Sequence, residues 1–310
     1  MQSLRICILI QTATDLSNYY KQLFVEYDIY FITFKRYNAQ AIDFMPNSTW
    51  SEGRNRLWQH VKDQYDYYLF LDDDLEFSGL SISVPPFIEN ALEEDGASLY
   101  QYMNSQMLRE LFYDKLTYFD IQVATFRNFS NDRIAFEREF LKNNLRIRPV
   151  GWFDAQATLF SNFAANLLLP YDTLFSGWHS AQIPIYTLAH FAFGAASVSI
   201  IDIACNNLNH TQYREDYNSV KDCRKMVEWL KLGINYDYEE QYLIESHEDR
   251  VNLCFAQQYI KQNRVKLIGK TQLMTSVQCF DNISKYFDIK HAYFSERQSN
   301  FRKSERLNNI

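Results

Sequence analysis

The stretch YYLFLDDDLEF, residues 67–77, places three consecutive aspartates, Asp72 to Asp74, directly after an apolar run. The run 67–71 has the length and continuous apolar character of a strand that is buried on both faces of a sheet. A charge removed from water without a partner is costly, so a core cannot accept these carboxylates unpaired. The aspartates therefore predict either a solvated turn or a site where a cation lies opposite them.

Two strand–helix units precede this strand. Residues 4–12 and 28–37 are expected strands, and residues 15–27 and 47–65 are expected helices with apolar side chains every three to four residues. This alternation predicts a parallel sheet with right-handed crossovers. The three aspartates then follow a central strand at its carboxyl end, which is where ligands bind in open α/β sheets.

The rest of the chain has a less regular pattern. Its expected elements are helices within 85–118, strands within 119–126, 146–162 and 196–207, and helices from about 218 onward, most clearly at 238–262. For the helix in 47–65, Ser48, Thr49 or Ser51 is the expected N-cap. We expect a catalytic domain over residues 1–215, whose nucleotide half covers about 1–80 and whose acceptor half covers 81–215, and a helical extension over residues 216–310.

Composition excludes several classes of protein. The 310 residues carry a formal net charge of −7, which repels polyanions, so no nucleic-acid partner is expected. The five cysteines lie far apart without a Cys-x-x-Cys pair, which is typical of a reducing, cytoplasmic location. No apolar stretch is long enough for a transmembrane helix, and peripheral contact with a membrane is left open.

The spacing of the aspartates favours a metal site. Strand side chains alternate between faces, so Asp72 and Asp74 are expected to point one way and Asp73 the other. Neighbouring carboxylates repel one another unless a cation lies near them. Mg²⁺ and Mn²⁺ prefer oxygen ligands and are commonly completed by phosphate oxygens. The pattern predicts a cation that is held by the carboxylates and bridged to a diphosphate.

The longer segment SEGRNRLWQHVKDQYDYYLFLDDDLEF, residues 51–77, resembles the nucleotide-sugar half of GT-A-type glycosyltransferases. Those enzymes carry an Asp-x-Asp motif after a central strand, and the preceding helix often opens with an Arg-Asn pair, here Arg54 and Asn55. The resemblance covers about residues 4–77 and becomes loose through 146–213. It implies a Rossmann-like α/β fold with a mostly parallel sheet flanked by helices. It also implies metal-dependent transfer of a sugar from a nucleoside diphosphate donor, most often a UDP-sugar.

The resemblance also implies roles for individual residues. Asp74 would bind Mn²⁺ or Mg²⁺ directly, and Asp72 would contact the ribose or a metal-bound water. The residues implied in donor binding are Gln11, Thr12, Arg54, Asn55, Asp72 and Asp73. The alternative for Arg54 is a surface ion pair with Glu52 or Asp63.

A histidine late in the chain often completes the metal site in this family. His210 follows the strand expected within 196–207 and lies in a polar segment. Neutral imidazole is a suitable third ligand for Mn²⁺. The alternatives are an exposed loop histidine at this position, or His179 in the ligand role.

An inverting transferase needs a base near the acceptor hydroxyl. Asp154 and Asp172 are the candidates, because both lie in aromatic surroundings of the kind on which sugar rings stack. Turn capping is the alternative for Asp172, which follows Pro170 and Tyr171. The acceptor is expected to be a glycan or another hydroxyl compound.

Two other functions remain open at this point. A haloacid-dehalogenase-type phosphatase would use Asp72 as a nucleophile, but the position two residues after Asp74 is then a Thr or Val, whereas here it is Glu76. A non-catalytic carbohydrate-binding protein on a GT-A scaffold would bind sugar without a metal. The retained run of three aspartates argues against such decay.

Overall fold

The computed structural model describes residues 4–80, 100–119, 121–128, 147–150, 155–171 and 197–207, together with 173, 177, 178, 181, 182, 185, 186, 189 and 193. The expected helical extension over residues 216–310 lies outside this part of the chain. The proposed division into domains therefore stays a prediction.

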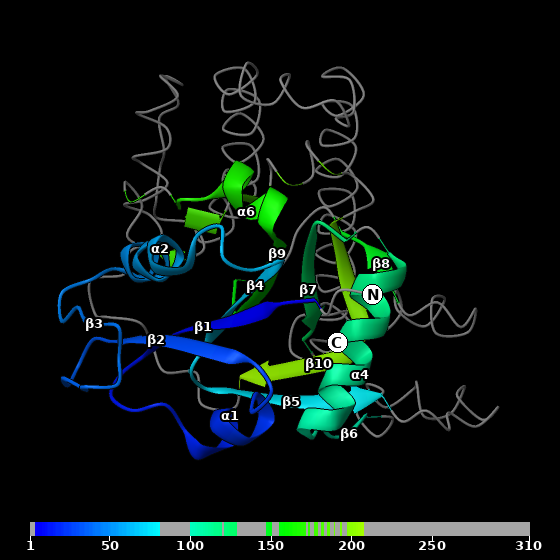
Figure 1. Ribbon diagram of the computed structural model, residues 1–310, viewed down its shortest axis with the longest axis horizontal. Coiled ribbons are helices and arrows are strands. Elements are labelled where there is room, and N and C mark those ends of the chain that lie inside the picture. The colour runs from blue at the N-terminus through cyan, green and yellow to red at the C-terminus, as the bar shows by residue number, and fades with distance from the viewer. Residues whose placement is uncertain are drawn as a thin grey trace, which may run out of the picture.

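One large sheet organises the described residues (Figure 1). Its spatial order is β3-β2-β1-β4-β9-β7-β10-β5-β6, and β8 pairs with β10 outside this path. The strands are β1 (Ile6–Thr12), β2 (Asp28–Thr33), β3 (Asp43–Phe44), β4 (Tyr67–Asp72), β5 (Leu75–Leu80), β6 (Tyr100–Tyr102), β7 (Val123–Arg127), β8 (Ile147–Pro149), β9 (Ala157–Ser161) and β10 (Ser197–Asn207).

The sheet is mixed, which corrects the expectation of a mostly parallel one. β1 is parallel to both β2 and β4, and β2 is parallel to β3, so the N-terminal half has the expected Rossmann-like pattern. Beyond β4, β9 runs antiparallel to both of its neighbours, and β10 is parallel to β7 but antiparallel to β5. An apolar run does not indicate whether a strand will be parallel or antiparallel to its neighbours. That direction depends on how the connecting segment brings the chain back to the sheet.

The helices begin at the polar residues that the sequence offers as caps. The described helices are α1 (Asn18–Leu23), α2 (Trp50–Val61), α4 (Ser105–Tyr118) and α6 (Asn162–Leu168). Thr49 is the N-cap of α2 and forms a capping box with Glu52, so one of the three expected caps is confirmed. Within the described residues, no helix has the length and apolar character needed to cross a membrane.

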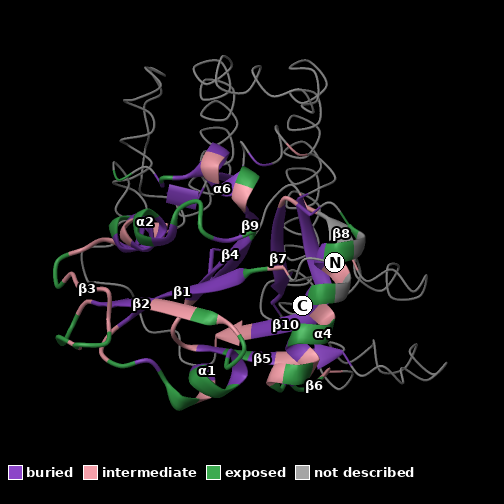
Figure 2. Cartoon of the chain, viewed as in Figure 1, coloured by how far each residue is buried: buried purple, intermediate pink, exposed green. Residues whose placement is uncertain are grey.

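Two apolar layers cover the two faces of the sheet. Cys7, Leu9 and Phe70 pack with α2 and α6 on one face, while Ile8 and Ile10 pack with α1 and α4 on the other. The central strands are buried along their length (Figure 2). Since strand side chains alternate, Gln11 and Asp72 fall on the face that α2 covers. The polar ends of β1 and β4 are therefore directed toward α2.

Candidate functional site

The carboxyl ends of β1 and β4 lie side by side at one edge of the sheet. Gln11 is opposite Asp72 in the register of these strands. Residues 72–75, here called the carboxylate turn, connect β4 to β5, and Asp72, Asp73 and Asp74 are all half-buried there. The aspartates thus lie where the parallel half of the sheet presents its ligand-binding edge.

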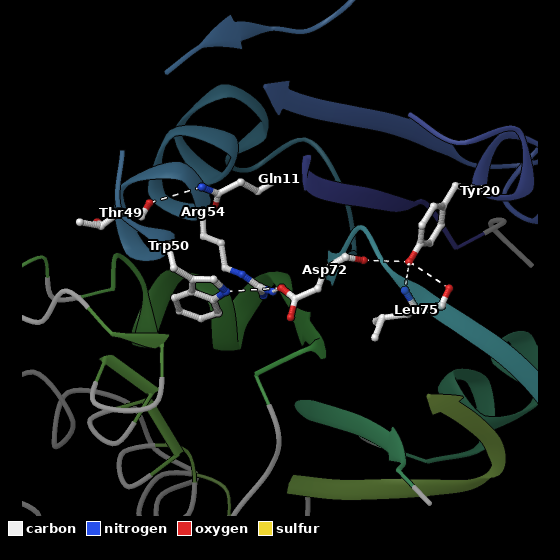
Figure 3. A network of polar contacts seen from close by, with 7 residues as sticks. All are labelled: Gln11, Tyr20, Thr49, Trp50, Arg54, Asp72 and Leu75. Atoms are coloured by element: carbon white, nitrogen blue, oxygen red, sulfur yellow. Dashed lines mark hydrogen bonds and ion pairs between the residues drawn. The ribbon is translucent and has the colours of Figure 1, made fainter. Parts of the chain in front are cut away.

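Asp72 is held by the helix that packs on its strand. Nη2 of Arg54 donates to Oδ1 of Asp72 at 2.8 Å, and the indole N–H of Trp50 points to the same oxygen at 3.4 Å (Figure 3). The guanidinium carbon lies 4.2 Å from the Trp50 ring centroid, and Arg54 is only 1% exposed. The alternative of a surface ion pair is therefore wrong. Glu52 instead closes the capping box, and Asp63 accepts from Asn166.

Asp73 ties the carboxylate turn to the loop that leaves β1. Its Oδ2 accepts a hydrogen bond from the backbone N–H of Ala13 at 3.1 Å. The carbonyl of Ala13 in turn accepts from the backbone N–H groups of Lys35 and Arg36, just beyond β2. Three loops at the carboxyl edge are thereby joined through one residue. Asp72 and Asp73 thus have partners on different elements, Arg54 on α2 and Ala13 after β1. The expected shared direction of Asp72 and Asp74 stays a prediction.

Tyr20 reaches the same turn from α1, on the other face of the sheet. Its hydroxyl donates to the carbonyl of Asp72 at 2.8 Å and accepts from the backbone N–H of Leu75 at 3.0 Å (Figure 3). Burial raises the pKa of Tyr20 well above its ordinary value of 10, and the charges of the three aspartates raise it further, while the contact with Leu75 lowers it. The hydroxyl therefore keeps its proton at any working pH.

Gln11 lies against the first turns of α2. Its Nε2 approaches the carbonyl of Thr49 at 3.4 Å, and its buried Oε1 has no hydrogen-bond partner among the residues that the structure describes. Gly53 makes this approach possible, because a Cβ at that position would overlap the carboxamide of Gln11. Buried acceptors without a partner are rare in folded proteins, and a ligand or a water molecule is one way in which such an oxygen is satisfied.

Asn55 uses its amide to hold the chain beyond α6. Its Nδ2 donates to the carbonyl of Tyr171 at 2.9 Å, and its Oδ1 accepts from the Tyr171 backbone N–H at 2.7 Å. The Tyr171 ring then packs edge-on against Trp50, with 4.9 Å between the centroids. Burial raises the pKa of Tyr171 to about 12, and the nearby Arg54 guanidinium acts in the opposite direction. Asn55 thus positions the aromatic wall around Arg54, and its role in donor binding stays a prediction.

The structure brings Gln11, Arg54 and Asp72 together. Thr12 is buried at the end of β1, and its hydroxyl lies 3.4 Å from the carbonyl of Asp15. Asp154, Asp172 and His210 lie outside the described residues, as does His179, so their roles stay predictions. Sequence reasoning missed the contacts of Trp50, Tyr20 and Tyr171. Only the aromatic spacing of the two helices hinted at the first two.

The carboxylate oxygens of Asp72, Asp73 and Asp74 are of the type that hard divalent cations prefer as ligands. Within the described ranges, however, no three His, Cys, Asp or Glu side chains converge on one point that could hold a metal ion. Oδ1 of Asp72 is engaged by Arg54 and Oδ2 of Asp73 by Ala13. Mg²⁺-type sites commonly use one or two carboxylates and take their other oxygens from substrate phosphates and water. The carboxylate turn is compatible with such a partial site.

The fold and this edge define a mixed α/β protein with a Rossmann-like N-terminal half. No protein-family model matches the sequence, and no curated protein sequence matches it significantly. Among solved structures, it is similar to the mannosyltransferase PcManGT from Pyrobaculum calidifontis in complex with GDP-Man and Mn²⁺. That similarity has a TM-score of 0.39 and 10% identity over 84% of this chain and 75% of the other.

A crystal structure described only as a mycobacterial protein is also similar, with a TM-score of 0.41 and 12% identity over 76% of each chain. At these values neither similarity assigns a family, a ligand or a residue role to this chain.

Proposed function

We propose that this protein is a divalent-metal-dependent glycosyltransferase, which moves a sugar from a nucleoside diphosphate donor to a hydroxyl acceptor. The observation that carries the proposal is the register of β1 and β4, which places Gln11 beside Asp72 and the carboxylate turn at the ligand-binding edge. The unpartnered Oε1 of Gln11 at this edge supports a ligand there. The resemblance of residues 51–77 to GT-A enzymes supplies the reaction class.

In this proposal each part of the edge has a separate task. Asp74 and Asp72 hold Mn²⁺ or Mg²⁺, with His210 as a further ligand. A bound divalent cation supplies Lewis-acid neutralisation of the charge on the leaving diphosphate. Arg54 orients Asp72 through their 2.8 Å contact, so a cation at Asp72 would share the carboxylate with the guanidinium.

The remaining donor contacts come from the loops that surround the carboxylate turn. Gln11 and Thr12 border the nucleoside, which is most often uridine in the family that the sequence resembles. Asp73 keeps the loop after β1 in place through Ala13. Asn55 supports the wall behind Arg54 through the backbone of Tyr171.

Deprotonation of the acceptor hydroxyl is assigned to Asp154 or Asp172. Replacement of the true base by asparagine should lower turnover while leaving binding of the nucleoside diphosphate intact, because a general base acts only on the acceptor. The variant that behaves in this way identifies the base.

The phosphatase alternative is disfavoured by the surroundings of Asp72. A nucleophilic carboxylate attacks through one of its oxygens. Oδ1 of Asp72 accepts from Arg54 at 2.8 Å and faces the Trp50 indole N–H at 3.4 Å, so attack would be left to Oδ2. We therefore place Asp72 in ligand positioning and not in covalent catalysis.

The test is calorimetric titration of the full chain with UDP and with GDP, each in the presence and absence of Mn²⁺. We expect one nucleotide to bind in a Mn²⁺-dependent manner. Asp74→Asn should weaken that binding at least about tenfold, since it removes a charged ligand but keeps the shape of the side chain.

Asp66→Asn is the matched control. Asp66 lies at the opposite end of β4, where its carboxylate accepts from the backbone N–H of Arg5 at 2.8 Å. This variant should bind nucleotide like the wild type. Absence of Mn²⁺-dependent binding for both nucleotides would contradict the proposed function.

A further inference from the structure

Tyr20 contacts the two backbone groups that close the carboxylate turn. In a four-residue turn, the carbonyl of the first residue and the N–H of the fourth face each other. Here those groups belong to Asp72 and Leu75, and the Tyr20 hydroxyl donates to the first at 2.8 Å and accepts from the second at 3.0 Å. The carbonyl of Leu75 lies a further 3.2 Å from the same hydroxyl. One side chain therefore spans the turn from end to end.

The Tyr20 side chain is itself held firmly. It is 1% exposed, and its ring stacks on Phe24 with 5.8 Å between centroids and 9° between planes. Leu75 is 2% exposed, so water does not compete for its N–H. Removal of the hydroxyl takes a hydrogen-bond partner from these buried backbone groups, which is costly away from water.

We propose that Tyr20 is a positioning residue for the divalent cation: its hydroxyl sets the backbone conformation of the carboxylate turn and so the placement of the Asp72 and Asp74 carboxylates. The proposal rests on the proposed function for the cation itself. Groups behind metal ligands that orient them typically change metal affinity by about 10- to 100-fold when they are removed. Because Tyr20 contacts backbone, its effect reaches every side chain of the turn.

Tyr19 provides a matched control on the same helix. Its hydroxyl accepts from the backbone N–H of Phe77 at 2.8 Å, two residues beyond the turn. Tyr19 and Tyr20 thus both anchor β5 to α1, but of these two hydroxyls only that of Tyr20 hydrogen-bonds to residues 72–75. Replacement of either tyrosine by phenylalanine keeps the ring and removes one hydroxyl.

The experiment titrates Mn²⁺ into the full-length wild type, Tyr20→Phe and Tyr19→Phe, and follows the electron paramagnetic resonance signal of free Mn²⁺ with and without UDP or GDP. We expect Mn²⁺ binding to weaken about 10- to 100-fold in Tyr20→Phe and less than about twofold in Tyr19→Phe. Equal Mn²⁺ affinity in Tyr20→Phe and the wild type, or an equal loss in both variants, would overturn the proposal. Chemical unfolding checks that both variants are folded.

Amide hydrogen exchange separates this inference from the proposed function. In Tyr20→Phe the amide of Leu75 should exchange faster than in the wild type, whereas Tyr19→Phe should accelerate Phe77. A wild type that binds no Mn²⁺ contradicts the proposed function, and exchange at Leu75 then still decides the role of Tyr20. Unchanged exchange at Leu75 in Tyr20→Phe refutes that role.

Discussion

Arg54 is the residue whose surroundings explain the most about the candidate site. Its guanidinium is 1% exposed, pairs with Asp72 and lies over the faces of Trp50 and Phe70. Burial of an arginine requires such compensation, because its charge is not removed by deprotonation. The aromatic faces and the carboxylate together satisfy it, although Nη1 has no hydrogen-bond partner within the described part of the chain. Arg54 thereby couples the position of α2 to that of the carboxylate turn.

Arg54→Met should destabilise the protein strongly. It leaves the Asp72 carboxylate, whose side chain is 18% exposed, without its cation. Loss of one partner of a buried pair typically costs about 3–5 kcal/mol, and partial exposure of Asp72 reduces the expectation to about 2–4 kcal/mol. Urea unfolding measures the difference.

Arg56→Met is the control for this prediction. Arg56 lies on the same helix and pairs with Asp43, but both side chains are more than a third exposed. Surface pairs of this kind contribute about 0–1 kcal/mol. Equal losses of unfolding free energy in Arg54→Met and Arg56→Met would show that the buried ion pair contributes no more to stability than the exposed one.

The roles and positions of single residues were predictable where they depend on neighbouring residues in the sequence. The Thr49 cap and the position of the aspartates follow from neighbouring residues in the sequence. The partners of Asp72 do not, since Arg54 is 18 residues away and Tyr20 is 52 residues away. Which side chain meets a turn depends on the helix face that packs on the strand. Sequence periodicity limits that face to a stripe of residues and names no single contact.

Between elements, α2 and β1 fit closely at Gly53. Gly53 lies in the first turns of the helix, where the carboxamide of Gln11 occupies the space that a side chain would fill. Glycine inside a helix costs about 1 kcal/mol relative to alanine. We attribute its presence to the approach of Gln11, which brings the end of β1 to the helix beside Thr49.

Gly53→Ala should therefore not raise the free energy of unfolding by the amount that helix propensity alone predicts. The gain of about 1 kcal/mol in helix propensity is offset, because the methyl group displaces the buried Gln11 carboxamide. In a Gln11→Ala background the same substitution should stabilise by the full amount. A double-mutant cycle by urea unfolding measures the coupling. Additive effects of the two substitutions would contradict the proposed fit.

Elements were predictable in kind but not in arrangement. The strands β1 and β2 and the helix α2 fall inside the ranges expected from apolar spacing, and β4 extends one residue beyond the expected 67–71. β5 was not expected, because the run that follows the aspartates is short, although its first residues alternate between buried and exposed side chains. The place of β9 between β4 and β7 was also not predictable. Strand order is decided by pairings between residues far apart in the sequence, and one sequence alone does not reveal these pairings.

In the sheet as a whole, strands from the expected nucleotide half, about residues 1–80, pair with strands from the expected acceptor half, residues 81–215. β4 is bordered on one side by β9, and β5 pairs with β10 and β6. The segment that resembles a nucleotide-binding half therefore obtains its outer pairings from residues 100–102, 157–161 and 197–207.

A fragment of residues 1–80 should consequently not fold on its own. The free edge of β4 and the buried face of β5, with Leu75 and Phe77 each 2% exposed in the intact sheet, would be open to solvent. We expect no cooperative thermal transition by circular dichroism for the fragment, whereas the full chain should have one. A cooperative transition in the fragment would contradict this prediction.

The two-residue link between β4 and β5 also constrains the length of the aspartate run. Leu75 and Phe77 are placed opposite Asn207 and Cys205, with their side chains in the core. An inserted or deleted residue that shifted β5 by one position would exchange its buried and solvent-facing side chains. A fourth aspartate would thus disturb packing before it could add a ligand. The run acts as a spacer of fixed length as well as a source of negative charge.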